Sequence, residues 1–216
     1  MKKTTITTLK LLAISCLLVK QISAQSLKKS ITQLDAAKTV DELLASEQNF
    51  IKFIAEGKKL HQGYYYAALN NLYIAFMDTL RTDDYCARAD KFLFQLDSLA
   101  PNNSEAYVLM AMSAGAKINV DRAARQMKLG TLANKHSDRA TSINPENPRA
   151  WLIKAKTVMN GPPKLGGGAK FALKYYQKAV DKYKTFKPLS DTEPNWGAEM
   201  AKKELEECQK QLKTKN

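Results

Sequence analysis

The sequence has little of the material from which metal sites and disulfide frameworks are built. Its 216 residues include only two His and three Cys, which leaves almost nothing for a zinc centre or a dense cysteine pattern. His61 and His136 are far apart, and no Ser–His–Asp or Cys–His arrangement accompanies either. Cys86 and Cys208 favour the interpretation of small buried thiols, although a disulfide stays open. We expect no catalytic residues, no cofactor, no metal and no enzymatic activity.

The sequence also has no apolar run long enough to cross a membrane. Its main run, Leu11–Val19, has nine residues, whereas a spanning helix needs about 20. The basic start Met1-Lys2-Lys3 and the closing Ile22-Ser23-Ala24 complete the pattern of a secretory signal peptide cleaved after Ala24. The alternative is a lipoprotein acylated at Cys16, although Cys16 lies inside the run. We expect an exported protein, either periplasmic or secreted, without a transmembrane segment in the mature chain.

Acidic side chains are in the minority. Lys and Arg total 34 against 21 Asp and Glu, which gives a net charge of +13. Removing residues 1–24 takes away four lysines and no acid, and lowers the net charge to +9. The excess is concentrated in residues 149–216, with 15 basic and 7 acidic side chains. Nucleic acid is a poor fit, because the chain is exported and its basic stripe lacks interleaved exposed aromatics.

What the sequence does have is helical periodicity. From Thr39 onward, apolar residues recur at the spacing of amphipathic helices, and no segment alternates for long with a period of two. Thr39 and Glu42 match a capping box, Ser104 and Asn195 match N-caps, and Pro148 suits the first position of a helix. The pattern predicts eight helices, which start near residues 40, 64, 83, 104, 121, 148, 169 and 196.

One segment is repeated along the chain. Pro101–Tyr107 resembles Pro145–Trp151 at an offset of 44 residues, and Trp196 follows Trp151 by 45. A repeated helical unit of this length cannot bury its apolar face alone, so neighbouring units stack. We therefore expect helical hairpins packed one upon the next.

These units resemble the tetratricopeptide repeat family. Its second-helix signature of small and aromatic residues is matched by Ala172, Tyr176 and Ala179, and in part by Ala133, Ala140 and Pro145. The family period is 34 residues, and these units are about ten residues longer. A closer resemblance is to exported repeat proteins typical of Bacteroidota, which have no assigned activity. It is carried by Asn147-Pro148-Arg149, Gly166-Gly167-Gly168, Phe186-Lys187-Pro188 and Pro194-Asn195-Trp196-Gly197.

The resemblance implies an all-α fold of antiparallel helical hairpins, stacked as a short right-handed solenoid. The expected organisation is a signal peptide at 1–24, an N-terminal capping helix region at 25–62 and a repeat domain at 63–216. Within the repeat domain the units span about 63–103, 104–147 and 148–190, and a C-terminal capping helix covers 195–212.

The same resemblance implies a non-catalytic scaffold for protein–protein interaction in the cell envelope. Ligands of the family lie along the inner face formed by the first helices of the units. The positions that this places on the face are Glu105, Val108, Met112, Arg149, Leu152, Lys156 and Met159. They form an apolar strip with a basic rim, so the expected partner is an envelope protein or a peptide with an acidic end.

The alternative is a periplasmic binder of a small anionic ligand. Gly166, Gly167 and Gly168 precede a predicted helix with Lys170 in its first turn. Backbone N–H groups of such a loop can hold phosphate. No strand precedes the loop, as a Walker A motif would require, so a simple turn is the other interpretation. The identity of the partner or ligand and the oligomeric state stay open.

Overall fold

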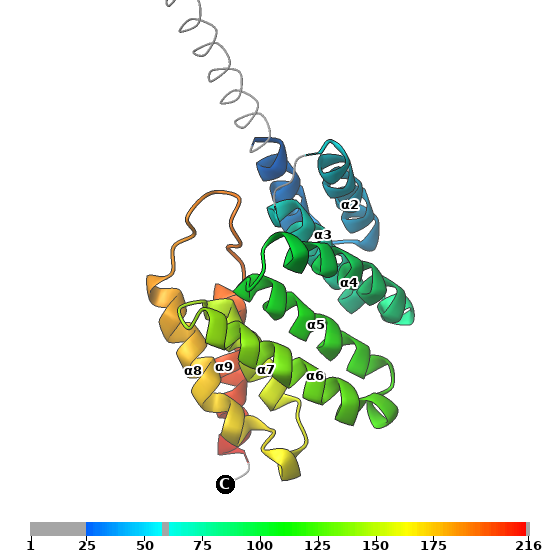
Figure 1. Cartoon of the computed structure of the whole chain (residues 1–216). Coiled ribbons are helices and arrows are strands. Elements are labelled where there is room, and N and C mark those ends of the chain that lie inside the picture. The colour runs from blue at the N-terminus through cyan, green and yellow to red at the C-terminus, as the bar shows by residue number, and fades with distance from the viewer. Residues whose placement is uncertain (1–24, 58–60, 215–216) are drawn as a thin grey trace, which may run out of the picture.

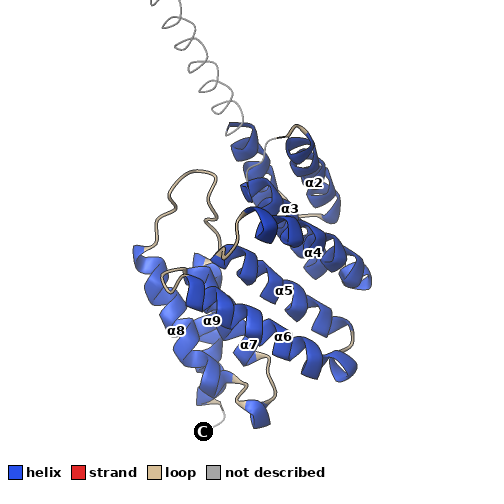
Figure 2. Ribbon diagram, in the orientation of Figure 1, coloured by secondary structure: helices blue, strands red, loops and turns tan. Residues whose placement is uncertain are grey.

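The fold is all-α. A computed structural model describes residues 25–57 and 61–214, and every regular element among them is a helix (Figures 1 and 2). The all-α prediction is therefore confirmed. The predicted signal peptide, its cleavage after Ala24 and the possible acylation of Cys16 fall on residues 1–24, outside the described part. No helix of the described part is long and apolar enough to cross a membrane.

The helices follow one another along the chain, with longer connections before α8 and α9 than between the earlier helices. The first covers residues 25–36 and has no counterpart among the predicted helices. The others are α2 Val40–Ala55, α3 His61–Met77, α4 Thr82–Leu99, α5 Ser104–Val120, α6 Arg122–Ile143, α7 Pro148–Met159, α8 Ala169–Thr185 and α9 Ala198–Lys213. Two short 3-10 turns are η1 Thr79–Arg81 and η2 Pro163–Leu165.

The helix ends follow local side-chain chemistry. The predicted capping box at the start of α2 is confirmed: the Thr39 hydroxyl accepts from the Glu42 backbone N–H, and the Glu42 carboxylate accepts from Thr39. The α5 cap lies one residue earlier than predicted, because Asn103 rather than Ser104 accepts from the Glu105 N–H. The predicted Asn195 cap of α9 is wrong, since α9 starts after Gly197, which has a left-handed backbone.

Successive helices pack as pairs, and the first helix of each later pair contacts both helices of the pair before it. The helix pairs are α3 with α4, α5 with α6, and α7 with α8. The first helices also contact in the order α3, α5, α7, while α2 packs on α3 and α9 packs on α8. Figure 1 shows the resulting progression from α2 at the upper right to α8 at the lower left. α3 and α5 lie in the middle and bury most of their residues, so both are apolar around most of their circumference.

A buried polar cluster, which we call the Glu105–Arg149 network, joins the first helices. One carboxylate oxygen, Glu105 Oε1, accepts from Arg149 Nε at 2.9 Å, Arg149 Nη2 at 2.8 Å and Asn147 Nδ2 at 2.8 Å. The other oxygen accepts from the Tyr65 hydroxyl at 3.4 Å. The Arg149 side chain is only 3% exposed. A buried ion pair of this kind needs several hydrogen bonds to offset the loss of water. The network supplies four to the Glu105 carboxylate, whereas Arg149 Nη1 is buried without an acceptor among the described residues.

The same network anchors the long connection between α8 and α9. The Trp196 indole N–H donates to the Tyr65 hydroxyl at 2.7 Å, and the Tyr183 hydroxyl donates to the Trp196 carbonyl at 2.9 Å. The Arg149 guanidinium lies 4.5 Å from the centre of the Phe186 ring. The connection, residues 186–197, thus returns across the first helices before α9 begins (Figure 1).

Breaking the Glu105–Arg149 network should cost much stability. Replacing Arg149 by Met leaves the Glu105 carboxylate without its buried cation, and we expect the free energy of unfolding to fall by about 3–5 kcal/mol. The matched control is Lys182→Met, at a solvent-facing ion pair with Glu146, where the expected loss is about 0–1 kcal/mol. Urea unfolding followed by circular dichroism measures both. Equal losses in the two variants would contradict the central role of the network.

Both cysteines of the described chain are free and fully buried. Burial raises the pKa of the Cys86 thiol to about 11 and also raises the pKa of Cys208. Since the thiolate is the reactive form, we expect neither of these two thiols to react with Ellman's reagent at pH 8 until denaturant is added. A rapid reaction in the folded protein would show that these helices open readily.

Candidate ligand-binding site

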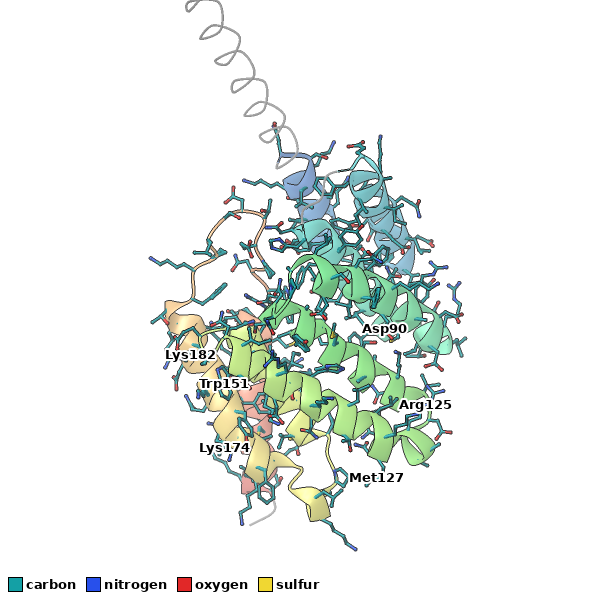
Figure 3. All side chains as sticks on the ribbon, in the orientation of Figure 1. Asp90, Arg125, Met127, Trp151, Lys174 and Lys182 are labelled. Carbon is teal, nitrogen blue, oxygen red and sulfur yellow. The ribbon has the colours of Figure 1, made fainter. Side chains whose placement is uncertain are left out.

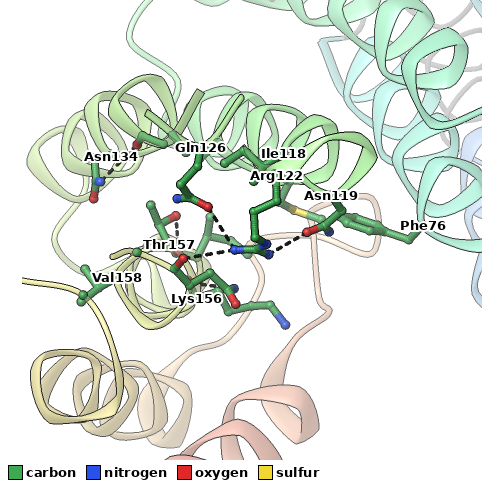
Figure 4. Close-up of a pocket in the computed structure, with 18 of the residues that line it drawn as sticks. Phe76, Ile118, Asn119, Arg122, Gln126, Asn134, Lys156, Thr157 and Val158 are labelled. Carbon is green, nitrogen blue, oxygen red and sulfur yellow. Dashed lines mark hydrogen bonds between the residues drawn. The ribbon is translucent and has the colours of Figure 1, made fainter. Parts of the chain in front are cut away.

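A pocket of about 700 Å³ lies between the first helices, the start of α6 and the loop after α7. Figure 4 shows it in close-up, with Arg122 and Gln126 of α6 facing Lys156 and Thr157 of α7. Most of the exposed lining surface is apolar. The larger apolar side chains of the lining are Leu43, Tyr73, Phe76, Met77, Met112, Ile118, Met127, Ile153, Val158, Leu165, Trp196 and Met200.

Four of the lining side chains are methionines from four different helices. They are Met77 of α3, Met112 of α5, Met127 of α6 and Met200 of α9. Methionine is unbranched and polarizable, so a methionine-lined surface adapts to the shape of a bound molecule and contacts aromatic rings well. Met77, Met127 and Met200 are also between 42% and 63% exposed. The apolar lining therefore reaches the surface of the protein.

A glycine gives the pocket part of its depth. Gly115 of α5 lines the pocket, and a Cβ atom built at this position would have no atom within 4 Å. Glycine in the interior of a helix destabilises it by about 0.5–1 kcal/mol relative to alanine. Its presence here opens space next to the α5 backbone, and any larger side chain would point into that space.

The glycine-rich loop forms a wall of the pocket, but its amides are already bonded within the chain. Gly166 and Gly167 line the pocket, whereas Gly168 and Lys170 are not among its lining residues. The Gly166 and Gly167 N–H groups donate to the Pro163 and Pro162 carbonyls, and the Gly168 N–H donates to Val158. A Cβ atom at Gly167 would clash with the Gly161 backbone. The loop is therefore closely packed, and these three N–H groups are not available to cradle an anion.

The lining is positively charged. Among the residues that the structure describes, it contains Arg122 and Lys156 and no Asp or Glu. The Lys156 ammonium is bonded to the Glu204 carboxylate of α9, which also accepts from the Tyr176 hydroxyl at 3.1 Å. Arg122 has only neutral acceptors around it, on Asn119, Gln126 and Asn160 (Figure 4). The pocket thus combines an apolar surface with one cation that no carboxylate neutralises.

Few side chains of the lining could bind a metal ion. No His or Cys lies among the described lining residues, and no group of three or more His, Cys, Asp and Glu side chains in the described chain could hold a metal. His136 lies instead in a smaller hollow between α4 and α6. Burial, followed by the charge of Asp35, raises the pKa of the Tyr73 phenol, so this group keeps its proton at neutral pH. The methionine thioethers are the remaining soft ligands.

The structure separates the residues predicted to bind a partner. Met112 and Lys156 line the pocket. Glu105, Val108, Arg149 and Leu152 are buried or nearly so, and Glu105 and Arg149 bond to each other. Met159 is partly buried against the core. No finding tests these residues as partner contacts, so that assignment stays a prediction.

Several lining residues had no place in the sequence prediction. They include Tyr73, Gly115, Arg122, Met127 and Met200. One signal was available for Arg122: it occupies the first position of α6, where the helix dipole disfavours a cation. The others carry no local mark, because only the packing of separate helices brings them together.

The basic C-terminal third forms a separate outer surface. Figure 3 shows Trp151, Lys174 and Lys182 along the side formed by α7 and α8. The Trp151 and Tyr175 rings stack with centres 6.3 Å apart, and the Lys178 ammonium lies 3.6 Å from the centre of the Trp151 ring. None of these side chains lines the pocket, so the basic stripe and the pocket are distinct features.

Comparison with known proteins replaces the predicted family and function. No family model matches the sequence, and no curated protein sequence matches it. Among solved structures, the fold is similar to the HusA haemophore from Porphyromonas gingivalis, with a TM-score of 0.81 and 26% identity. The match covers 87% of this chain and 93% of the haemophore.

The assignment to the tetratricopeptide repeat family is therefore wrong, as is the closer likeness drawn to exported repeat proteins of unassigned activity. The predicted scaffold for an envelope protein or peptide is overturned by the same likeness, because the similar protein is a carrier of haem. The physical reason is that the repeat pattern reports how helices pair, which does not determine what their inner face binds. The likeness agrees better with the alternative, a binder of a small ligand.

Proposed function

We propose that this protein binds haem or a closely related porphyrin in the pocket between its first helices, as a non-catalytic carrier. The observation that supports this is a largely apolar, methionine-rich pocket with a cationic edge. It occurs in a fold similar over most of its length to a haemophore. The predicted use of the glycine-rich loop changes accordingly: Gly166 and Gly167 would act as a wall against which the ligand packs.

The pocket has the size and chemistry that such a ligand needs. Its volume of about 700 Å³ lies within the range of about 300–1,000 Å³ that is usual for sites of small molecules and cofactors. A porphyrin is flat and apolar over both faces, and burial of apolar surface contributes about 25 cal/mol per Å². Aromatic and thioether side chains from several helices, among them Phe76 and Met112, would cover those faces.

The overall arrangement that we propose places this pocket on an inner surface. Three helical hairpins, spanning about 63–103, 104–147 and 148–190, would stack as a short right-handed solenoid. The region 25–62 would cap one end and the helix in 195–212 the other. The first helices α3, α5 and α7 would line the concave side, which is where the pocket lies. The leader at 1–24 would direct export, so that the ligand is met outside the cytoplasm.

Filling the pocket should weaken binding without harming the fold. In a Gly115→Phe variant the ring would occupy the space next to α5, and we expect haem affinity to fall at least about tenfold. Stability should hold or rise, because glycine costs a helix about 0.5–1 kcal/mol. Gln209→Phe on the exposed side of α9 is the matched control and should bind as the parent does. Unchanged affinity in Gly115→Phe would sink the proposed site.

Tryptophan fluorescence gives a readout specific to the pocket. Trp196 lines the pocket, whereas Trp151, the other tryptophan, does not. In a Trp151→Phe background the remaining emission comes from Trp196 alone. Haem in the pocket should quench it with the same midpoint that the Soret absorbance gives.

Iron should contribute little to affinity. Because the described lining offers no imidazole or thiolate, and the Tyr73 phenol keeps its proton, we expect metal-free protoporphyrin IX to bind within about tenfold of haem. Titrations of the same protein with both ligands measure this. Tight binding of haem with no detectable binding of the metal-free ring would show instead that iron coordination, by a methionine or another group, supplies most of the affinity.

A further inference from the structure

Of the two cations in the described pocket lining, Arg122 is the one without a carboxylate partner, and it has N–H groups left to donate. Its Nη1 donates to Gln126 Oε1 at 3.0 Å and to the Asn160 carbonyl at 3.4 Å, and its Nη2 donates to Asn119 Oδ1 at 3.0 Å. A guanidinium has five N–H groups. Within the described chain, Nε has no acceptor and Nη2 has one acceptor for its two hydrogens. Nε and Nη2 share one edge of the group, which is an edge that can pair side-on with a carboxylate.

Helix stability does not account for this arginine. Arg122 is the first residue of α6, directly after the N-cap Asp121. The amino end of a helix carries partial positive charge, so a cation there is unfavourable. The Asp121 carboxylate is engaged with the Ala124 N–H at 3.0 Å and forms no ion pair with Arg122. The position is therefore poor for the helix but well placed at the edge of the pocket.

The surrounding contacts hold the guanidinium in position without neutralising it. All three acceptors are amide oxygens, and they come from the end of α5, from α6 and from the end of α7. Figure 4 shows the Arg122 side chain between Asn119 and Gln126, facing the space that Lys156 and Phe76 also border. An arginine fixed by neutral groups keeps its full charge and has already lost most of its rotamer freedom. Both properties favour anion binding.

The other cations nearby are already paired with acids. Lys156 is bonded to Glu204, and Arg125, one turn along α6, pairs with Asp83 at 2.7 Å. A ligand carboxylate would have to displace Glu204 to reach Lys156, whereas Arg122 needs no such exchange. The choice between the two lining cations therefore falls on Arg122.

We propose that the Arg122 guanidinium forms a side-on ion pair with a carboxylate of the bound ligand, and so selects acidic over neutral or esterified porphyrins. This inference rests on the proposed function, since it assigns a role within the same pocket. The apolar lining would cover the ring while Arg122 fixes its acidic edge and thereby its orientation. The bidentate match is what distinguishes an arginine from a lysine at this place.

The test compares an acidic ligand with its neutral ester. Protoporphyrin IX and its dimethyl ester share the ring and differ in the charge of the side groups. Both are titrated against the parent, Arg122→Gln and Arg122→Lys, with affinity read from Trp196 quenching in the Trp151→Phe background. Arg139→Gln is the matched control, because Arg139 is exposed, donates to the neutral Asn102 side chain and lies outside the pocket lining.

We expect Arg122→Gln to weaken the acid about tenfold to a hundredfold, as for a lost hydrogen-bonded charge pair, and to leave the ester within about twofold. Arg122→Lys should keep only part of the preference for the acid, and Arg139→Gln should change neither ligand. Thermal unfolding of each variant checks that the fold is retained.

Two results would overturn the inference while leaving the proposed function intact. Equal weakening of acid and ester in Arg122→Gln would mean that Arg122 only shapes the pocket by holding α6 against α7. Unchanged affinity for both ligands would mean that the carboxylates lie elsewhere. If the parent protein bound neither porphyrin, the proposed function itself would fail and this inference with it.

Discussion

The buried ion pair of Glu105 and Arg149 holds the first helices and the last connection at one point. The two residues occupy equivalent positions of the repeated segment, 44 residues apart, and each follows an asparagine that caps its helix. Their contact sets α7 against α5 at one end. The Tyr65 and Trp196 bonds then bring α3 and the last connection to the same point. Because the charges are removed from water, the pair tolerates little change in this geometry.

The pocket follows from that arrangement. With α3, α5 and α7 fixed side by side, the pocket lies toward the carboxyl ends of these helices, where the start of α6 and the loop after α7 complete the walls. The lining keeps an apolar surface near solvent, which costs solubility unless something covers it. Methionine and glycine suit a surface that a ligand covers, since methionine adapts to the shape of the ligand and glycine leaves room for it. Arg122, the one lining cation without a carboxylate partner among the described residues, would then set the orientation of a ligand in this largely apolar site.

Local chemistry explains why the helices were predictable. The Thr39–Glu42 capping box, Pro148 at the start of α7 and the extent of α8 depend on neighbours within one turn, and each is found as predicted. The helix at residues 25–36 was missed because it precedes the stretch with clear periodicity. Arg149 and Glu105 were assigned to a binding face because the sequence places both in the first turn of a first helix. In the structure their side chains bond to each other between the helices. Their opposite charges at equivalent positions of the repeated segment were the available sign that they pair.

An all-α chain of paired helices could be predicted from the residues alone, because helical spacing, caps and breakers act over a few residues. The distribution of charge along the chain was also evident, with residues 25–116 nearly neutral and residues 149–216 basic. The packing of the helices then places the lysine stripe of α8 on the outside, buries Arg149 and Lys154 of α7, and brings Lys156 and Arg122 to the pocket. The reason is that a binding surface is shared among helices far apart in the chain. Packing of the helices is what brings separate residues to one cavity, among them Tyr73, Gly115, Arg122 and Met200. No local sequence pattern predicts that they lie together.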